Sequence, residues 1–463
     1  MTAAEALAQF GTDLRHGMIP EKVTRAAKES ILDTLGCGLA AVALDEGTAA
    51  LAVVKQEGAE GAANAIGIPT GLPATSAALA NGMLCHALDF DDTHEGARAH
   101  VGSVVVPAAL AAAQANKRSG AEMITAVVAG AEVAIRVGLA TGGAMHARGF
   151  HPTSVNGIFG ATIAAAHLYG LDAGQTTAAM GLAGSMASGL MEYLGDGSPT
   201  KPLHAGWAAH GALYCAQLSR AGGRGPASVL EGRFGVLASY AGGVGRLDEE
   251  LSDLGDRWEV PNILPKLYPA CHYVHSCVDA ARRVTPNRTL NPQEIMRVTA
   301  RIPRAGAALV VEPVEVKRRP RTTYEAKFSL PYVVAAQLVR GDVTIQTFTK
   351  SAIADQAVLS VSERIGLEFW EAGDEPSALA GEVLVELANG DRRHALVTNT
   401  PGAGDNPLPA DAMGQKYRAN AGLALDSELV DDLAREVMAL DYVPTVERVG
   451  AILSYARSFR PAS

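Results

Sequence analysis

Two long charge-free stretches constrain what this chain of 463 residues can fold into. Residues 149–171 and 173–191 contain no Asp, Glu, Lys or Arg, and each is long enough to span a bilayer. Both stretches nevertheless contain many glycines and polar residues such as His151, Asn156 and Gln175. We therefore expect buried helices of a soluble protein rather than membrane spans.

The pattern from Pro20 to about residue 240 is one helix after another. Apolar residues recur at helical spacing, and no strand pattern interrupts them. The segments are rich in Ala and Gly, which predicts helices that pack closely. We expect helices at residues 20–35, 76–88, 107–116, 121–139, 157–169, 175–193 and 207–221.

The pattern changes after about residue 290. Residues 297–302 alternate as a strand does, and the apolar run 308–311 is expected to be a second strand. Residues 382–398 predict a hairpin around Asn389-Gly390, because this dipeptide supplies the positive φ of a tight turn. With helical segments at 330–339 and 345–354, this region is typical of an α+β domain.

Residues 400–409 are rich in Pro and Gly and are expected to be a linker, after which residues 410–459 are helical again. A chain of this length suits two domains. The predicted fold class is therefore mainly α with an inserted, smaller α+β domain. Both chain ends would form the large all-helical domain, residues 1–266 and 405–463, and residues 267–404 would form the insert.

Charge and cysteine usage restrict the class of partner. The net charge of −10 argues against a nucleic acid or an anionic membrane as partner, since phosphate contacts need a basic surface. An anionic ligand would need a local basic pocket. The five cysteines are odd in number and scattered, which favours a reducing cytoplasm. No apolar segment typical of a signal peptide appears near the N-terminus.

Residues 86–100 hold three aspartates and three histidines. If residues 76–88 form a helix, then Asn81, Cys85 and Asp89 share one face at spacings of four. Such a polar row beside an apolar stripe predicts a site. An Asp-Asp pair alone would more often be a solvated helix end.

Three further segments place histidine or lysine at loops or helix ends. His151 precedes Pro152, which predicts extended or turn backbone before the next helix. Lys201 and His204 lie three residues apart in a proline-containing segment that we expect to be a loop.

The last segment has His272 and His275 one turn apart at an expected helix start, with Asp279 one turn further as a possible orienting carboxylate. Taken singly, such residues are more often structural. Together they concentrate more than half of the 12 histidines where catalytic groups commonly lie. Imidazole can move a proton next to a carboxylate, and lysine can neutralise carboxylate charge, so the set suits proton abstraction from small organic acids.

Several other kinds of site are less well supported. Residues 91–95 have the DDxxE spacing of magnesium-dependent terpene synthases, and residues 89–92 match the acid motif of protonating cyclases. Those enzymes stabilise carbocations with aromatic pockets, and only 5% of this chain is aromatic. Cys271 and Cys277 have the wrong spacing for an iron–sulfur cluster.

Cofactors have equally little support. A zinc site from Asp89, His94 and His100 is conceivable, but no paired-ligand signature accompanies it. The glycine patterns of Rossmann and P-loop nucleotide sites are absent. We therefore expect no cofactor and no metal. A non-catalytic helical protein that binds a small molecule stays an alternative, although such a protein would not require His151, Lys201 and His275.

The chain resembles the MmgE/PrpD family over nearly its whole length. That family includes 2-methylcitrate dehydratase, cis-aconitate decarboxylase and iminodisuccinate epimerase. The motifs that carry the resemblance are residues 81–107, Gly149-Phe-His-Pro-Thr153, Gly189-Leu-Met-Glu-Tyr-Leu-Gly-Asp-Gly197, Lys201-Pro-Leu-His-Ala-Gly-Trp207, Leu230-Glu-Gly-Arg-Phe-Gly235, Tyr268-Pro-Ala-Cys271 and Lys327-Phe-Ser-Leu-Pro331.

The resemblance implies a homodimer in which the α+β domain is a lid over the helical domain, with a cofactor-free site between them. By motif match, the pocket residues of the family fall on Asp89, Thr93, His100, His151, Lys201 and His275. In the family the histidine after the aspartates usually opens a His-Pro-Ser, whereas here it opens His100-Val-Gly-Ser103.

The expected function is a cytoplasmic lyase or isomerase of a small di- or tricarboxylate. Dehydration of a citrate-like hydroxy acid is our first choice, and the alternatives are decarboxylation of an unsaturated tricarboxylate and epimerisation of an amino or imino dicarboxylate. Lys201 and His151 would hold carboxylates, and His275 or His100 would move the proton. Asp89 would orient a histidine. The expected substrate-binding residues are Thr93, His151, Lys201, His204 and His272.

Overall fold

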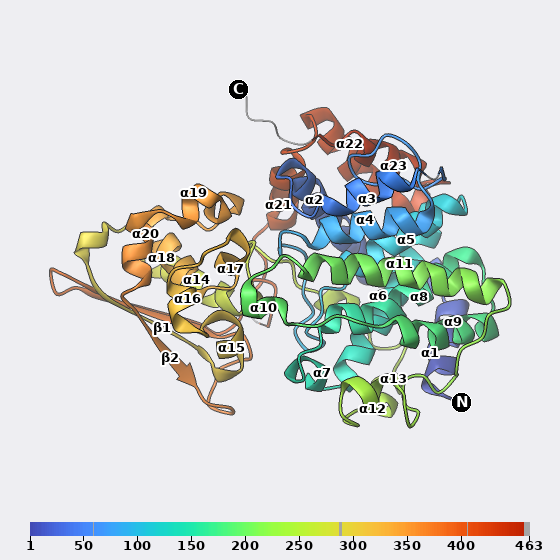
Figure 1. The fold of residues 1–463 in the computed structure, drawn as a ribbon, viewed down its shortest axis with the longest axis horizontal. Coiled ribbons are helices and arrows are strands. Elements are labelled where there is room, and N and C mark those ends of the chain that lie inside the picture. The colour runs from blue at the N-terminus through green and yellow to red at the C-terminus, as the bar shows by residue number, and fades with distance from the viewer. Residues whose placement is uncertain (59, 287–288, 405, 458–463) are drawn as a thin grey trace. The chain divides into compact units, whose positions relative to one another are not determined.

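The computed structural model describes the chain except for residues 59, 287–288, 405 and 458–463 (Figure 1). It divides into two compact units. Unit 1 comprises Met1–Glu192, Pro199–Pro265 and Asp411–Ser463, and unit 2 comprises Tyr193–Ser198 and Lys266–Ala410. The protein is mainly helical with a small α+β part, as the sequence predicts.

Unit 1 is built from helices, and no strand of the sheet belongs to it in the described residues. Both ends of the chain contribute, since α21 and α22 pack on α2 and α23 packs on α5. Its α-helices are α1 (Ala3–Asp13), α2 (Glu21–Ala43), α3 (Ala49–Glu57), α4 (Ala74–His86), α5 (Gly102–Ala115), α6 (Gly120–Ala140), α7 (Ala144–Ala147), α8 (Pro152–Tyr169), α9 (Ala173–Met186), α11 (Lys201–Arg220), α12 (Val236–Tyr240), α13 (Leu247–Leu251), α21 (Ala412–Ala421), α22 (Ser427–Met438) and α23 (Glu447–Ser454).

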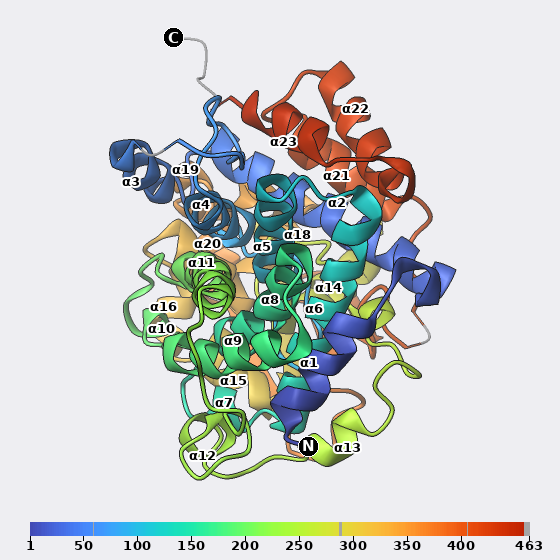
Figure 2. The ribbon, with the colours of Figure 1, turned by 90° about the vertical axis from the view of Figure 1, so that its right-hand side faces the viewer.

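The core of unit 1 is formed by α4, α5, α6, α8 and α11, which lie against one another (Figure 2). Glycines allow the closest crossing. A Cβ atom on Gly82 of α4 would lie 2.7 Å from the Cα atom of Gly206 in α11. Only residues without a side chain let two helices approach so closely. The expectation that the Ala- and Gly-rich helices pack tightly is confirmed.

The two charge-free stretches form α8 and α9, and α8 is buried along nearly its whole length. Within the described residues, α6 is the one helix long and apolar enough to cross a membrane, and 94% of its most apolar stretch is buried. Burial of this extent is typical of a core helix in a globular unit.

Unit 2 contains a four-stranded sheet in the order β2-β1-β3-β4. β1 pairs with β2 in parallel and with β3 antiparallel, and β3 and β4 form an antiparallel hairpin. The helices α14 and α18 pack against each other, and α14 also contacts β3 and β4. The elements are β1 (Ile295–Pro303), β2 (Ile365–Trp370), β3 (Gly381–Leu387), β4 (Arg392–Val397), α10 (Tyr193–Asp196), α14 (His275–Val284), α15 (Ala307–Val310), α16 (Val314–Arg318), α17 (Thr323–Lys327), α18 (Leu330–Arg340), α19 (Lys350–Ile353) and α20 (Gln356–Ser362).

The predicted strand at 297–302, the hairpin around Asn389-Gly390 and the helix at 330–339 are confirmed. The predicted strand at 308–311 is wrong, because Ala307–Val310 is a helical turn that continues the 3₁₀ turn before it. A four-residue apolar run fits either structure equally well. The sequence analysis also missed β2, and the expected helix at 345–354 is a 3₁₀ turn followed by α19, separated at Thr349.

Candidate functional site

The aspartate-rich segment begins where α4 ends, at His86 rather than at Leu88 as expected. Asp89 has a left-handed backbone conformation, with φ of 52°. The predicted polar row of Asn81, Cys85 and Asp89 is therefore broken at the helix end. The amide of Asn81 instead accepts from the backbone of Ile66 at 2.9 Å and donates to Asn64 at 3.0 Å, so this side chain holds a loop in place.

Lys201 and Asp89 form a buried ion pair. Lys201 Nζ lies 2.6 Å from Asp89 Oδ1, and the two side chains are 4% and 1% exposed. Lys201 is the first residue of α11, with Pro202 in the first turn, so the expected loop at this position is wrong. Proline fits the first turn of a helix because the amide there has no intrahelical partner. The lysine is therefore held rigidly in the interior of unit 1.

His100 joins this ion pair through one ring nitrogen. Its Nε2 lies 3.3 Å from Lys201 Nζ, while its Nδ1 lies 2.7 Å from the backbone carbonyl of Asp92 and 3.1 Å from Thr93 Oγ1. A carbonyl oxygen only accepts, so Nδ1 carries the proton and Nε2 accepts from the lysine. The His100 amide also donates to Thr153 Oγ1 at 3.0 Å.

His151 and His204 form an imidazole pair beside this group, with their Nδ1 atoms 3.1 Å apart. His151 is the extended residue immediately before α8, which confirms the backbone predicted from Pro152. Burial lowers the pKa of His151 well below its usual value, and Lys201 lowers it further. Burial also lowers the pKa of His204 to about 4. Both rings are therefore neutral near pH 7 and can each donate one hydrogen bond.

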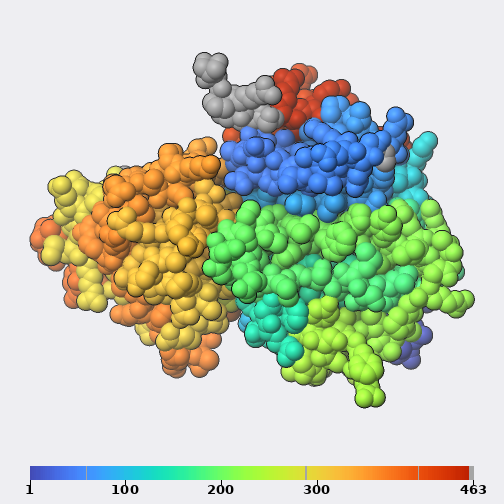
Figure 3. Space-filling view, viewed as in Figure 1, coloured from blue at the N-terminus to red at the C-terminus, as the bar shows by residue number. Residues whose placement is uncertain are grey.

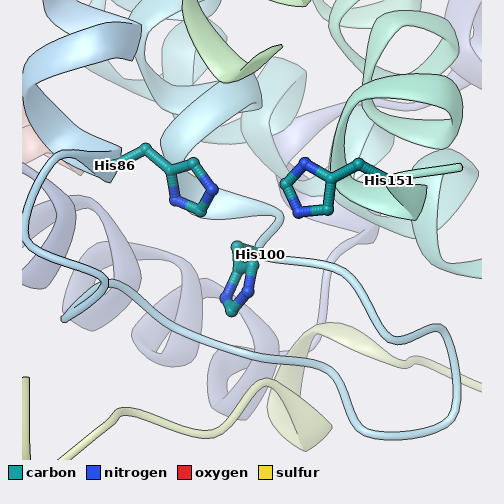
Figure 4. A group of neighbouring side chains, drawn as sticks. All are labelled: His86, His100 and His151. Carbon is teal, nitrogen blue, oxygen red and sulfur yellow. The ribbon is translucent and has the colours of Figure 1, made fainter. Parts of the chain in front are cut away.

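His86 is the residue that the sequence analysis missed. Its ring is fully buried, its Nδ1 lies 2.7 Å from Asp91 Oδ2, and it stacks on His151 with ring centroids 5.6 Å apart (Figure 4). The centroid of His100 is 5.0 Å away. His86 could have been found from its position one helical turn before Asp89. The sequence analysis instead assumed that the helix continues to residue 88, which places Cys85 on the same face as Asp89.

The loop between α4 and α5 is fixed by Asp92. Its carboxylate accepts from the Gly102 amide at 3.1 Å and from the Ser30 hydroxyl at 3.0 Å. Burial and the neighbouring Asp91 raise the pKa of Asp92 to about 7. A Cβ atom on Gly102 would collide with this carboxylate and with Thr34. The glycine in His100-Val-Gly-Ser103 is thus required by the local packing.

His94 has a structural role. Its Nε2 lies 3.1 Å from Glu259 Oε2, and its Nδ1 accepts from the Ala97 amide at 3.2 Å. The zinc site considered for Asp89, His94 and His100 is therefore not assembled, because both ring nitrogens of His94 are directed elsewhere. Two other groups in the described residues have ligand atoms within 4.8 Å of one another: His86, His100 and His151, and Asp89, Asp91 and His100. The Lys201 ammonium contacts both groups, which opposes a second cation there.

His272 and His275 lie in unit 2, where a 3₁₀ turn leads into α14. The predicted helix start at this position is confirmed. The two ring centroids are 4.7 Å apart, and His275 Nε2 lies 3.2 Å from the carbonyl of Ala270. Asp279 accepts from the Tyr268 hydroxyl at 2.6 Å, and the Tyr268 ring packs edge-on against His275. The carboxylate predicted to orient His275 is thus bonded to the tyrosine that packs on it.

The structure brings six of the predicted site residues together within unit 1 and places the other two in unit 2. The six are Asp89, Thr93, His100, His151, Lys201 and His204. One lysine and several neutral imidazoles, shielded from water, can bind carboxylates and hold protons close to them.

Two family models together match most of the chain. The MmgE/PrpD N-terminal domain matches residues 5–246, and the MmgE/PrpD C-terminal domain matches residues 268–441. The chain belongs to the MmgE/PrpD family. This conclusion confirms the resemblance found in the sequence motifs.

Relatives in the MmgE/PrpD family match almost the whole chain. The cis-aconitate decarboxylase-like protein oryM of Aspergillus oryzae is 30% identical, over 97% of this chain and 96% of the relative. Human cis-aconitate decarboxylase is 30% identical, over 92% and 89% of the two chains. Cis-aconitate decarboxylase of Aspergillus terreus is 27% identical, over 94% and 92%.

Proposed function

We propose that this member of the MmgE/PrpD family is a cofactor-independent lyase that decarboxylates an unsaturated tricarboxylate of the cis-aconitate type. The observation that carries the proposal is the buried Lys201–Asp89 ion pair, bonded to His100 and surrounded by neutral imidazoles. The names of the relatives favour decarboxylation over dehydration of a citrate-like acid, which was the first choice from sequence. Dehydration and epimerisation are the second and third candidates.

The proposed chemistry uses charge and protons of the chain alone. Lys201 neutralises one carboxylate, and His151, with Thr93, His204 and His272, binds the others through hydrogen bonds. Loss of carbon dioxide leaves an electron pair on the carbon skeleton, which a histidine then protonates at carbon. His275 or His100 is the proposed proton donor. Decarboxylation needs one such donor, whereas dehydration needs a base that removes a proton from carbon and an acid that protonates the departing hydroxyl.

A panel of substrates tests the reaction. The purified protein would be incubated with cis-aconitate, citrate, 2-methylcitrate and small amino dicarboxylates, and the products would be followed by proton NMR. We expect cis-aconitate to lose one carboxylate and give an unsaturated dicarboxylate. Dehydration of a citrate-like acid with cis-aconitate left intact would replace decarboxylation by hydro-lyase chemistry. No turnover of the panel, with one of these acids bound, would favour a binding protein.

We also propose that the protein is a cytoplasmic homodimer. The five cysteines are all free and buried, which suits a reducing compartment. One face of α11 is exposed and apolar, and part of this helix lies on the surface seen in Figure 3. A second copy of the chain is the proposed partner of this face, because contiguous apolar surface of this kind marks protein interfaces. Its residues are Leu203, Trp207, Tyr214 and Leu218, each between 40% and 47% exposed.

Light scattering coupled to gel filtration tests the dimer. The wild-type protein should elute with twice the chain mass of 47.9 kDa. Leu218→Glu should shift the equilibrium toward the monomer, because it places a charge in the interface. Leu396→Glu in β4, at another exposed apolar residue, is the matched control. A wild-type monomer at all concentrations would exclude the proposal.

A further inference from the structure

His86 and Asp91 form a buried couple that the proposed chemistry does not use. Both residues are 0% exposed, and the couple is held by the hydrogen bond from Nδ1 to the carboxylate. Because the carboxylate only accepts when ionised, the proton of the neutral ring lies on Nδ1. The other nitrogen, Nε2, then carries a lone pair.

This lone pair has no hydrogen-bond partner among the described residues. A buried polar atom without a partner destabilises the folded state, so it calls for an explanation in a native structure. A bare imidazole nitrogen can accept a proton or a hydrogen bond, but it cannot donate. An anionic ligand can therefore bind at Nε2 only when this nitrogen takes up a proton as well.

Three imidazole rings come together at His86. The candidate ligand atoms of His86, His100 and His151 lie within 4.8 Å of one another, and the three rings surround a common space (Figure 4). A point central to three atoms that lie within 4.8 Å of one another is at most about 2.8 Å from each of them. An oxygen atom of a ligand at such a point is within hydrogen-bond distance of all three rings.

We propose that His86 is a further ligand-binding residue of this site, which takes up one proton from solvent when a polycarboxylate binds and then donates from Nε2 to a carboxylate oxygen. The inference rests on the proposed function, since it requires an anionic carboxylate in the site. The proton comes from the buffer, and no covalent bond forms or breaks. The imidazolium is an ion pair with Asp91.

Asp91 is the reason why the proton goes to His86 rather than to another ring. His151 and His204 share a hydrogen bond between two imidazole nitrogens, so protonation of one places a positive charge beside the other. The two nitrogens of His100 are bonded to Lys201 and to a carbonyl. The ring of His86 is hydrogen-bonded to the Asp91 carboxylate at 2.7 Å, and an ion pair of this kind stabilises the charged form.

The charges around His86 determine whether its ring is protonated. Asp91 and Asp89 raise the pKa of His86, whereas Lys201 and above all burial lower it, so the ring is neutral in the free protein. Behind Asp91 lies the Asp33–Lys416 pair, with Nζ 2.7 Å from the carboxylate. A bound polycarboxylate adds negative charge beside Lys201 and favours the protonated ring.

Calorimetry measures this proton uptake directly. Propane-1,2,3-tricarboxylate, which has no double bond and no hydroxyl group, would be titrated into the protein in buffers of different ionisation enthalpy slightly above neutral pH. The slope of the observed enthalpy against the buffer enthalpy is the number of protons taken up. We expect a slope of about one, and a Kd that weakens about tenfold per pH unit, as linkage requires.

Variants assign the proton to His86. In His86→Gln the slope should fall to near zero while the tricarboxylate still binds at Lys201. Asp91→Asn keeps the size of the side chain and its acceptor but removes the charge, so the slope should fall by more than half in this variant. It provides a second test of the proposal should His86→Gln not fold. His94→Gln is the matched control, because His94 is also buried and paired with a carboxylate but lies outside the group. Its slope should equal that of the wild-type protein.

The outcomes separate this inference from the proposed function. Binding of the tricarboxylate without proton uptake overturns the role of His86 and leaves the lyase proposal standing. Unchanged uptake in a folded His86→Gln or Asp91→Asn protein also overturns it. If the wild-type protein binds no polycarboxylate, both proposals fail.

Discussion

The histidines of unit 1 and those of unit 2 are assembled in different ways. In unit 1 the rings of His86, His100, His151 and His204 come from the end of α4, a loop, the residue before α8 and the first turn of α11. In unit 2, His272 and His275 lie one turn apart in a single short segment. The four histidines of unit 1 are brought together by tertiary structure, whereas the two histidines of unit 2 are already neighbours in the sequence.

This difference extends to their electrostatics. The unit 1 rings adjoin a buried lysine, and burial together with that lysine keeps His86 and His151 neutral. His275 is instead bonded to a backbone carbonyl and packs on Tyr268. The proposed function divides the roles, with Lys201 as the group that binds the anion and His275 or His100 as the proton donor.

The largest expected effect tests that division. His275→Gln keeps a donor for the Ala270 carbonyl but cannot carry the proton, so kcat should fall by about 10²- to 10⁴-fold with little change in the Kd of a substrate analogue. His272→Gln, one turn away, should mainly weaken binding. Steady-state kinetics and analogue titration make the measurement. Near wild-type kcat in His275→Gln would move the proton-transfer role to His100.

Removal of the lysine in unit 1 is expected to have the next largest effect. Lys201→Ala should lower kcat/KM by about ten- to a hundredfold, because a charge-assisted contact to the substrate is lost. The sequence analysis places this lysine in a loop, whereas in the structure it forms a buried ion pair. Since it is paired with Asp89 in the interior, the variant should also lose about 3 to 5 kcal/mol of stability.

A second substitution separates the two roles of Lys201. Asp89→Asn added to Lys201→Ala should restore much of the stability, because it removes the unpaired buried charge, but it should not restore activity. Urea unfolding and kinetics on the same samples make the comparison. Full activity in a folded Lys201→Ala protein would remove the lysine from the substrate site.

Asp92, in the loop between α4 and α5, should make the stability of the protein depend on pH. This effect is expected to be smaller than the loss of stability in Lys201→Ala. The pKa of Asp92 is about 7 in the folded protein against 3.8 as its ordinary value, so the folded state binds more protons between these values. Stability must then fall as pH rises through this window, by at most about 1.4 kcal/mol per pH unit. Asp92→Asn should flatten this slope, as measured by urea unfolding at several pH values. An unchanged slope would contradict the raised pKa.

Chelation is expected to have the smallest effect. Exhaustive treatment with a strong chelator should leave activity unchanged, because the lysine and the imidazoles supply the charge and the protons. Activity that is lost on chelation and restored by one divalent metal would contradict this expectation. It would then favour Asp89, Asp91 and His100 as a metal site.

Much of this protein can be predicted from its sequence where the signal is local. The hairpin at Asn389-Gly390 and the extended His151 before Pro152 follow from backbone preferences of one or two residues. The helical nature of unit 1 follows from long apolar periodicity. Local signals failed where a short apolar run fits two structures, as at Ala307–Val310.

The sequence alone also determined which residues are candidates for the site, because their types and motifs are visible without a fold. Only the tertiary structure decided which of them meet. The pairing of Lys201 with Asp89 joins residues 112 positions apart, and the pairing of His151 with His204 joins residues 53 apart. The assignment of Asn81 and His94 to structural bonds, and the emergence of His86 beside Asp91, depend on where α4 ends. No local pattern encodes these contacts, since packing against distant elements fixes them.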